Sequence, residues 1–236
     1  MDQIDMKIKG YSCSVVGSRD NNEDSLLVYD VNSLYAVADG IGGGEKGEVA
    51  SKMAVDGLQS NFAPGKSLRD IFRILQVSII NNALQLFGTP VMGTTLTAVQ
   101  IDRGVASVCH VGDSRCYFYD GNILQLMTVD HEHYDERYHG NVLDSYLGLD
   151  PTILELKIHE ESFSVVPGNR ILLCSDGLYK QLDETQITNI IKKNFSDPAK
   201  IVETLCNTAS KAEHSDNVTV VLVEVDFEDL PEEVKA

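Results

Sequence analysis

Apolar and polar positions along the chain follow two periods, which predict strands in some stretches and helices in others. Several apolar runs are short and bounded by polar or turn residues, as is typical of strands. Asp-Gly at 120–121 lies between two such runs and favours a hairpin. The predicted strands are residues 10–16, 25–30, 33–38, 94–101, 105–111, 116–119, 123–127, 153–159, 170–174 and 218–225.

Four other stretches repeat their apolar residues at helical spacing. The second is the clearest, because Ser67 with Asp70 resembles a capping box and an apolar stripe follows, ending at Leu86. Asp183 and Asp197 are suited to cap the last two helices. The predicted helices run from about 45 to before Pro64, and over 68–86, 184–193 and 198–211.

This order of elements predicts an α+β fold in which two antiparallel sheets pack face to face with helices outside. Residues 130–149 are polar and rich in His and Tyr, and predict a long loop with at most a short helix. No change of composition marks a boundary, so we expect one domain over residues 1–236. Its core spans about 10–225, and the acidic tail at 226–236 is expected to fray or lie on the surface.

The formal net charge is −17, from 19 Lys and Arg against 36 Asp and Glu. This balance argues against nucleic acid or an anionic membrane as the main partner, although bound divalent cations would offset part of it. The 5 cysteines form no C-x-x-C pair and predict buried thiols in a reducing compartment. The N-terminus lacks an apolar signal segment and no run reaches membrane-spanning length, so we expect a cytoplasmic protein.

Three acids occupy matching places beside apolar strands. Asp39 and Asp176 each follow such a run and precede glycine, and Asp216 comes just before the final strand. If the last strand is antiparallel to the other two, the three carboxylates meet at one sheet edge. Most Asp-Gly and Asp-Asn dipeptides only mark turns. Three of them with the same relation to a strand favour a shared site.

Carboxylates held close together repel each other, and divalent cations remove that repulsion. Ligands that are all oxygen favour Mg²⁺ or Mn²⁺ over zinc. Asp39 is the candidate for a carboxylate that bridges two ions and a shared nucleophilic water, and the Gly40 carbonyl is a further candidate ligand. The polar segment 19–24 adds Glu23 and Arg19. The Arg19 guanidinium matches phosphate oxygens, although a lone arginine among acids is more often a salt-bridge residue.

Two other phosphate or metal motifs fit the sequence less well. Residues 20–31 begin like a calcium loop, but Ser25 and Val31 occupy the glycine and glutamate positions. Residues 42–47 match G-x-G-x-x-G, the dinucleotide-binding pattern. The antiparallel meander that follows is not the alternating βαβ arrangement that this pattern requires.

The ordered motifs of the chain resemble those of the metal-dependent serine/threonine protein phosphatases of the type-2C (PPM) family, especially the compact bacterial members. Each motif alone is weak, but the set is specific and covers about 10–225. The resemblance rests on Arg19-x-x-Asn-Glu-Asp-Ser25, Val37-Ala-Asp-Gly-Ile-Gly-Gly43, Gly93-Thr-Thr95, Val111-Gly-Asp-Ser-Arg115, Asp130-His131, Leu173-Cys-Ser-Asp-Gly177 and Asp216-Asn-Val-Thr219.

The resemblance implies a four-layer α-β-β-α sandwich with two Mn²⁺ or Mg²⁺ ions at one edge of the sheets. Asp39 then bridges the ions, and Asp176 and Asp216 complete one metal site. Gly40, through its carbonyl, and Glu23, through water, belong to the other.

The resemblance also implies that Arg19 binds the phosphate and that a third ion can bind at Asp130. Asp113 looks instead like a turn-forming residue. Animal members carry a histidine, proposed as general acid, where this chain has Ile41, so the proton donor is left unassigned. The segment 130–147 is short for a bacterial flap, and its histidines and acids are expected to form a solvated flap and not a separate metal site.

The implied activity is single-step hydrolysis of phosphoserine and phosphothreonine in proteins, without a phosphoenzyme. The expected partners are phosphoproteins and an opposing serine/threonine kinase, and the chain is expected to be a monomer. The alternatives are a pseudophosphatase that binds phosphoproteins without turnover, and a small-molecule phosphatase on the same scaffold.

Overall fold

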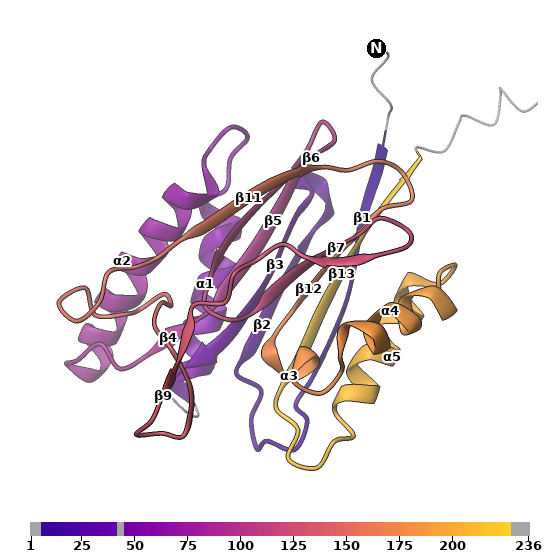
Figure 1. Cartoon of the computed structure of the whole chain (residues 1–236). Coiled ribbons are helices and arrows are strands. Elements are labelled where there is room, and N and C mark those ends of the chain that lie inside the picture. The colour runs from indigo at the N-terminus through magenta and orange to yellow at the C-terminus, as the bar shows by residue number, and fades with distance from the viewer. Residues whose placement is uncertain (1–5, 42–44, 228–236) are drawn as a thin grey trace, which may run out of the picture.

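Two antiparallel sheets lie face to face at the centre of the molecule, and helices cover both outer faces (Figure 1). The computed structural model describes residues 6–41 and 45–227. Two helices, α1 (Glu45–Asn61) and α2 (Leu68–Phe87), lie on one flank, and two others, α4 (Glu184–Lys193) and α5 (Pro198–Ala209), lie on the other. The predicted α+β fold with four α-β-β-α layers is therefore confirmed.

The two sheets draw their strands from different parts of the chain. One has the order β1 (Met6–Val15), β13 (Val218–Phe227), β12 (Arg170–Cys174), β7 (Arg115–Tyr119) and β8 (Leu124–Leu126). The other has the order β11 (His159–Ser164), β6 (Val105–Val111), β5 (Leu96–Asp102), β3 (Leu34–Ile41) and β2 (Asp24–Tyr29), with β4 (Gly93–Thr94) paired to β3. A separate hairpin joins β9 (Glu132–Asp135) and β10 (Gly140–Leu143).

The helices follow the expected apolar spacing. Ile71, Phe72 and Leu75 of the second helix are buried, whereas Leu86 at its end is exposed. The N-cap Ser67 makes no side-chain capping bond, in contrast to Asp183, which forms a full capping box with Gln186. The helices are α1 (Glu45–Asn61), α2 (Leu68–Phe87), α3 (Asp176–Tyr179), α4 (Glu184–Lys193) and α5 (Pro198–Ala209), with a 3₁₀ turn at Asp30–Asn32.

Three hydrophobic cores separate the four layers. Strand β3 contributes to two of them, because successive side chains of a strand point to opposite faces. Leu34 and Ala36 pack with α1 and α2, while Tyr35 and Val37 pack against the other sheet. A strand buried on both faces has a continuous apolar sequence, as this one does. The third core lies between α4, α5 and the β13 sheet.

Several predicted boundaries are wrong. Residues 151–158 form no strand: Ile153 is exposed, and Leu156 and Ile158 pack on the first core without pairing to a neighbour. The strand comes later, as β11. Residues 94–101 are divided into β4 and β5 at Thr95, and residues 130–149 contain the β9–β10 hairpin.

The ends of the chain also differ from the expectation. Strand β1 begins at Met6 instead of at 10, and β13 continues to Phe227, two residues into the predicted tail. The rest of that tail, 228–236, and Gly42–Gly44 lie outside the described residues. All five cysteines are free thiols, four of them buried. Among the helices of the described chain, none combines the length and apolar character needed to cross a membrane.

Candidate active site

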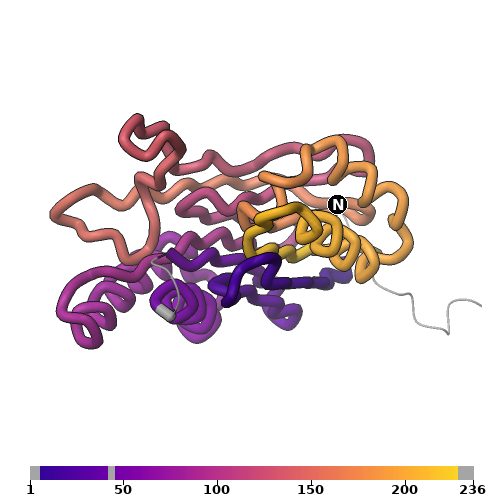
Figure 2. The backbone as a smooth tube through the Cα atoms, turned by 90° about the horizontal axis from the view of Figure 1, so that it is seen from below, coloured from indigo at the N-terminus to yellow at the C-terminus, as the bar shows by residue number. Residues whose placement is uncertain are grey.

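The acids singled out in the sequence line one pocket. Two of the segments that carry them, the first loop of the chain (indigo) and the loop before β13 (yellow), lie side by side in Figure 2. The pocket has a volume of about 560 Å³, and its walls come from motifs far apart in the chain. Of the predicted site residues, those that line it are Arg19, Glu23, Asp39, Gly40, Asp176 and Asp216.

The expectation that three of these acids share one sheet edge is wrong. Asp39 lies in β3, whereas Asp176 follows β12 and Asp216 precedes β13 in the opposite sheet. The expected antiparallel pairing of β12 with β13 is present, so the end of one adjoins the start of the other. The carboxylates meet because the two stacked sheets end together.

Asp39 is held through its backbone by two neighbouring threonines. Its N–H donates to Thr95 Oγ1, and its carbonyl accepts bonds from the Thr95 N–H and the Thr94 hydroxyl, each at 2.9 Å. Thr95 Oγ1 in turn lies 2.7 Å from Ser114 Oγ. These bonds satisfy both backbone groups of Asp39 and leave its carboxylate to line the pocket. They also give the Gly93-Thr-Thr95 motif a role that its sequence did not reveal.

Gly40 is required by the close approach of α1. A Cβ atom at Gly40 would lie 2.3 Å from the carbonyl oxygen of Gly47 and 2.7 Å from that of Glu23. A Cβ atom at Gly47 would lie 2.1 Å from Glu23 Oε2. Glycine permits such backbone contacts because it has no side chain. The packing of the two glycines therefore sets the position of the Glu23 carboxylate.

Asn217, to which the sequence assigned no role, fixes the loop that carries Arg19 and Glu23. Its Oδ1 accepts a bond from the Glu23 N–H at 2.8 Å. Its Nδ2 donates to the carbonyls of Val16 and Asn21, each at 2.9 Å. The asparagine follows Asp216 directly, so one dipeptide supplies a carboxylate and aligns the loop opposite.

The Arg19 guanidinium is bound to one of the candidate ligands. Its Nη2 lies 2.7 Å from Asp216 Oδ2, and the two side chains are 60% and 39% exposed. The bond to Asp216 raises the pKa of Arg19. Because an exposed ion pair of this kind contributes at most about 1 kcal/mol, a ligand can separate the two groups at low cost.

The carboxylates of the pocket oppose each other's ionisation. Loss of hydration, followed by the charges of Asp24 and Asp176, raises the pKa of Asp39 well above its usual value. Burial and the Asp176 charge likewise raise the pKa of Asp113 to about 7. Asp24, which pairs with Asp39 across β2 and β3, has its pKa raised to about 7, mainly by burial.

Divalent cations fit this donor set. Asp24 Oδ1 and Asp176 Oδ1 are buried and have no hydrogen-bond partner among the described residues. Carboxylate and carbonyl oxygens are the ligands that Mg²⁺ and Mn²⁺ prefer, and a cation would relieve both the repulsion and the unmet acceptors. No group of three or more His, Cys, Asp or Glu side chains within 6–41 and 45–227 is already drawn together around an ion position. The acidic side chains therefore line the pocket, but they are not grouped closely enough to hold an ion in the positions that they occupy here.

The surroundings of Asp113 and Asp130 differ from those expected for them. Asp113 lines the pocket and is almost completely buried, instead of serving only in a turn. Asp130, the expected ligand for a third ion, is not among the lining residues. Both of its oxygens accept bonds from Arg115, whose guanidinium stacks 3.6 Å from the ring centre of Tyr179. The sequence signal missed for Asp113 is that it comes two residues after the end of an apolar, mostly buried strand, β6.

The β9–β10 hairpin, which lies within the segment expected to form a flap, contributes an apolar wall to the pocket. Leu143 of β10 lines it beside Ile41, the residue found in place of the histidine of animal relatives. Neither side chain carries a proton that it could donate. In the hairpin itself, Asp135 pairs with Arg137, and His133 lies 4.0 Å from Asp144.

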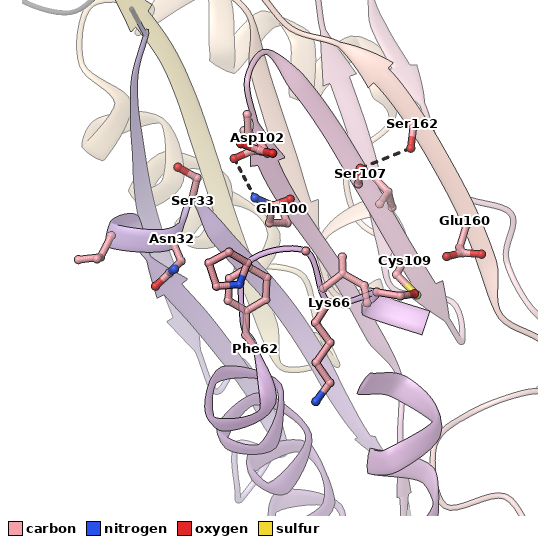
Figure 3. A pocket seen from close by; sticks show the side chains of 17 residues that line it. Asn32, Ser33, Phe62, Lys66, Gln100, Asp102, Ser107, Cys109, Glu160 and Ser162 are labelled. Carbon is pink, nitrogen blue, oxygen red and sulfur yellow. Dashed lines mark hydrogen bonds between the residues drawn. The ribbon is translucent and has the colours of Figure 1, made fainter. Parts of the chain in front are cut away.

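A second and slightly larger cavity, about 600 Å³, lies at the other end of the β3 sheet, beneath the α1–α2 connection (Figure 3). Its charged groups are bound to the protein itself. Lys66 donates to the carbonyl of Asn61 at 3.0 Å, and Glu160 is paired with Arg69. Of its lining residues only Asp102 and Glu160 are acidic, so it lacks the carboxylate cluster of the first pocket.

The motifs that build the carboxylate pocket fall within one family match. Residues 9–222 match the protein phosphatase 2C family. The chain belongs to this family. The sequence is 32% identical over 241 residues to the serine/threonine phosphatase stp of Listeria monocytogenes, covering 89% of this chain and 92% of the relative.

Two solved structures have a fold similar to that of this chain. PppA of Pseudomonas aeruginosa superposes with a TM-score of 0.83 at 30% identity, covering 94% of this chain and 100% of that one. The catalytic domain of the serine/threonine protein phosphatase PstP, in complex with 2 manganese ions, superposes with a TM-score of 0.77 at 26% identity. That match covers 94% of this chain and 100% of the PstP chain.

Proposed function

We propose that the chain hydrolyses phosphoserine and phosphothreonine in proteins, with Mn²⁺ or Mg²⁺ as cofactor. The observation that carries this proposal is the pocket in which Arg19 and the carboxylates of Asp39, Asp176 and Asp216 converge from distant motifs. Membership of the protein phosphatase 2C family supports the same reaction. The described chain acts as one phosphatase domain.

Each polar group of the pocket has a distinct task. Asp39 lines the same pocket as Asp176 and Asp216 of the β13 sheet and as Glu23, which suits it to bridge two ions. Asp176 and Asp216 would complete the ligands of one ion, and the Gly40 carbonyl, with Glu23 acting through water, would hold the other. When bound, the ions supply Lewis acidity that activates a water for attack on phosphorus.

Arg19 binds the phosphoryl group of the substrate. Its guanidinium, held beside the pocket by Asp216, can turn its donors to two phosphoryl oxygens at once. Asp216 is then released to act as a ligand. Ile41 and Leu143 form an apolar wall that excludes water from one side of the pocket and supplies no proton to the leaving alkoxide.

We propose that the pocket binds two ions. Asp130, expected to serve a third ion, does not line the pocket, and both of its oxygens accept bonds from Arg115. Its contribution is to fix Arg115 and, through it, Tyr179 of α3.

The test is phosphate release from a matched set of peptides that carry phosphoserine, phosphothreonine or phosphotyrosine. We expect Mn²⁺-dependent release from the first two and little from the third. Asp39→Asn should lower the rate by at least 1,000-fold, a loss of about 4 kcal/mol of transition-state stabilisation. Asp56→Asn, an exposed acid of α1, is the control. An undiminished rate in chelator, or in Asp39→Asn, would refute the assignment.

Two other functions share this scaffold. A pseudophosphatase that binds phosphoproteins has no chemical need for Asp39, Asp176, Asp216 and Arg19 together. A small-molecule phosphatase would differ in the flap, and hydrolysis of p-nitrophenyl phosphate without peptide hydrolysis would identify it. The partners that we propose are cytoplasmic phosphoproteins modified by an opposing serine/threonine kinase, and the acting species is a monomer.

A further inference from the structure

A lysine of the protein reaches into the carboxylate cluster. Lys180 follows α3, and its backbone N–H donates to the carbonyls of Asp176 and Leu178. Its Nζ lies 2.5 Å from Asp176 Oδ2 and 3.8 Å from Asp113 Oδ2. The side chains of Asp176 and Asp113 are only 16% and 9% exposed. The ammonium therefore lies between two largely buried carboxylates at the corner of the pocket.

Local structure holds this ammonium in place. Lys180 is four residues after Asp176, the spacing that brings side chains together on one helix face. The neighbouring Tyr179 lies under the Arg115 guanidinium, and its hydroxyl is 3.5 Å from Asp113 Oδ2. Arg115 is in turn fixed by Asp130. Contacts of Tyr179 and Lys180 therefore connect the end of α3 to Asp113 and Asp176, the two acids that Lys180 neutralises.

The position between Asp113 and Asp176 has the chemistry of a divalent-ion site. Both groups offer carboxylate oxygens, and Asp176 Oδ1 is buried without a partner among the described residues. A Mg²⁺ or Mn²⁺ ion there would need oxygen ligands at about 2.0–2.2 Å. It would also lie next to an ammonium that is already paired with the Oδ2 atoms of both carboxylates. Two cations do not share such a place without strong repulsion.

We propose that the Lys180 ammonium is a built-in cation that occupies the Asp113–Asp176 position, so that no divalent ion binds there. The inference rests on the proposed function, since it concerns the number of ions in that site. It explains how a cluster with Asp113 in addition to the bridging set is neutralised without a third ion. Arg19 differs, because it lies on an exposed loop and pairs with Asp216, from which a bound ion can release it.

The test counts bound ions directly. Free Mn²⁺ is measured by electron paramagnetic resonance after equilibrium dialysis of the full chain at millimolar Mn²⁺. We expect Lys180→Gln to bind one more Mn²⁺ per chain than the wild type. Lys180→Arg keeps the positive charge and should bind the wild-type number. The double variant Lys180→Gln with Asp113→Asn should lose the additional ion again.

Lys52→Gln is the matched control, because Lys52 pairs with Asp56 at the same four-residue spacing but on the exposed face of α1. It should leave the count unchanged. The inference is overturned if Lys180→Gln binds the wild-type number, or if the additional ion persists in the double variant. A wild-type chain that binds no Mn²⁺ would instead refute the proposed function, so the two failures are distinct. Circular dichroism of each variant confirms that the dialysed chain is folded.

Discussion

The side-chain oxygen of Asn217 accepts a hydrogen bond of 2.8 Å from the backbone N–H of Glu23, although the two residues are 194 positions apart in the sequence. The same side chain donates to the carbonyls of Val16 and Asn21. The first loop of the chain is thereby fixed to the start of the last strand. This amide, together with the packing of Gly40 and Gly47, therefore helps to set the distance between Glu23 and the acids of the β13 sheet.

Asn217→Ala should weaken both the fold and the reaction. Loss of three hydrogen bonds, at about 1 kcal/mol each, predicts a decrease of about 2–3 kcal/mol in the free energy of unfolding. Displacement of Arg19 and Glu23 should lower kcat/KM by about 10–100-fold. Urea unfolding and peptide dephosphorylation measure the two effects. Asn61→Ala, which removes a single bond to Gly57 at the far end of α1, should leave the rate unchanged.

Asp39 is expected to destabilise the metal-free fold while enabling the metal-loaded one. Its pKa is raised by burial and by neighbouring carboxylates, so its negative charge opposes folding when no cation is present. Asp39→Asn should raise the free energy of unfolding of the chelator-treated protein at pH 7.5 by about 0.5–2 kcal/mol.

The same substitution should abolish most of the stabilisation that Mn²⁺ gives to the wild type. Thermal unfolding with and without Mn²⁺ measures both effects, the higher stability of the metal-free variant and its smaller stabilisation by Mn²⁺. Asp56→Asn at the exposed surface serves as control and should change neither value by more than about 0.5 kcal/mol. Equal Mn²⁺ stabilisation in Asp39→Asn and wild type would show that Asp39 is not a ligand.

The parts of this structure that the sequence predicted are those governed by local pattern. The run at 34–38 is continuously apolar because both faces of the strand are covered, and this pattern predicts a buried strand. Helix α2 has apolar residues at helical spacing because only one of its faces is covered, and this pattern predicts a helix. The convergence of Asp39 with Asp176 depends on how two sheets stack, which no single segment encodes. It became predictable only from the ordered set of motifs that the chain shares with a known family.

The errors have similarly specific physical causes. In the stretch predicted as a strand, Leu156 and Ile158 pack on the core without strand pairing and Ile153 is exposed, an arrangement that the apolar pattern does not distinguish from a strand. Asp113 and Asp130 both stand beside strands in polar turns, and their roles depend on which one meets Arg115. The pairing of β7 with β12 determines the position of Arg115, because it places this residue opposite Cys174 and near the start of α3.

Asp130 is predicted to act on stability and not on the number of ions. Its carboxylate and the Arg115 guanidinium are 14% and 23% exposed, so removal of the charge leaves a partly buried cation without its partner. Asp130→Asn should lower the free energy of unfolding by about 1–3 kcal/mol. The Mn²⁺ count should stay at the wild-type value. Loss of an ion in this variant would restore Asp130 as a ligand.

A surface pair provides the matched control for that measurement. Asp102 and Arg103 are 57% and 78% exposed, and such pairs contribute about 0–1 kcal/mol. Asp102→Asn should therefore leave the urea midpoint nearly unchanged. A similar loss in both variants would indicate a general charge effect and not the Arg115 contact.

His110 is predicted to make the fold sensitive to acid. Its side chain is completely buried, with Nδ1 2.8 Å from Thr97 Oγ1 and Nε2 3.2 Å from the carbonyl of Val129. The His131 ring stacks on it at 5.0 Å, and His159 meets it edge-on at 6.3 Å. Burial, together with these two histidines, lowers the pKa of His110 to about 3.

The unfolded chain binds a proton at this residue near pH 6.5, whereas the folded chain does not until about pH 3. Acidification therefore favours the unfolded state, and between pH 7.5 and 5 the contribution of His110 falls by about 2 kcal/mol. His110→Gln should remove that part of the pH dependence. Urea unfolding of Mn²⁺-loaded wild type and variant at both pH values isolates it, because the carboxylates are common to both. The exposed His139→Gln should retain the wild-type slope, and an unchanged slope in His110→Gln would assign the acid sensitivity to other groups.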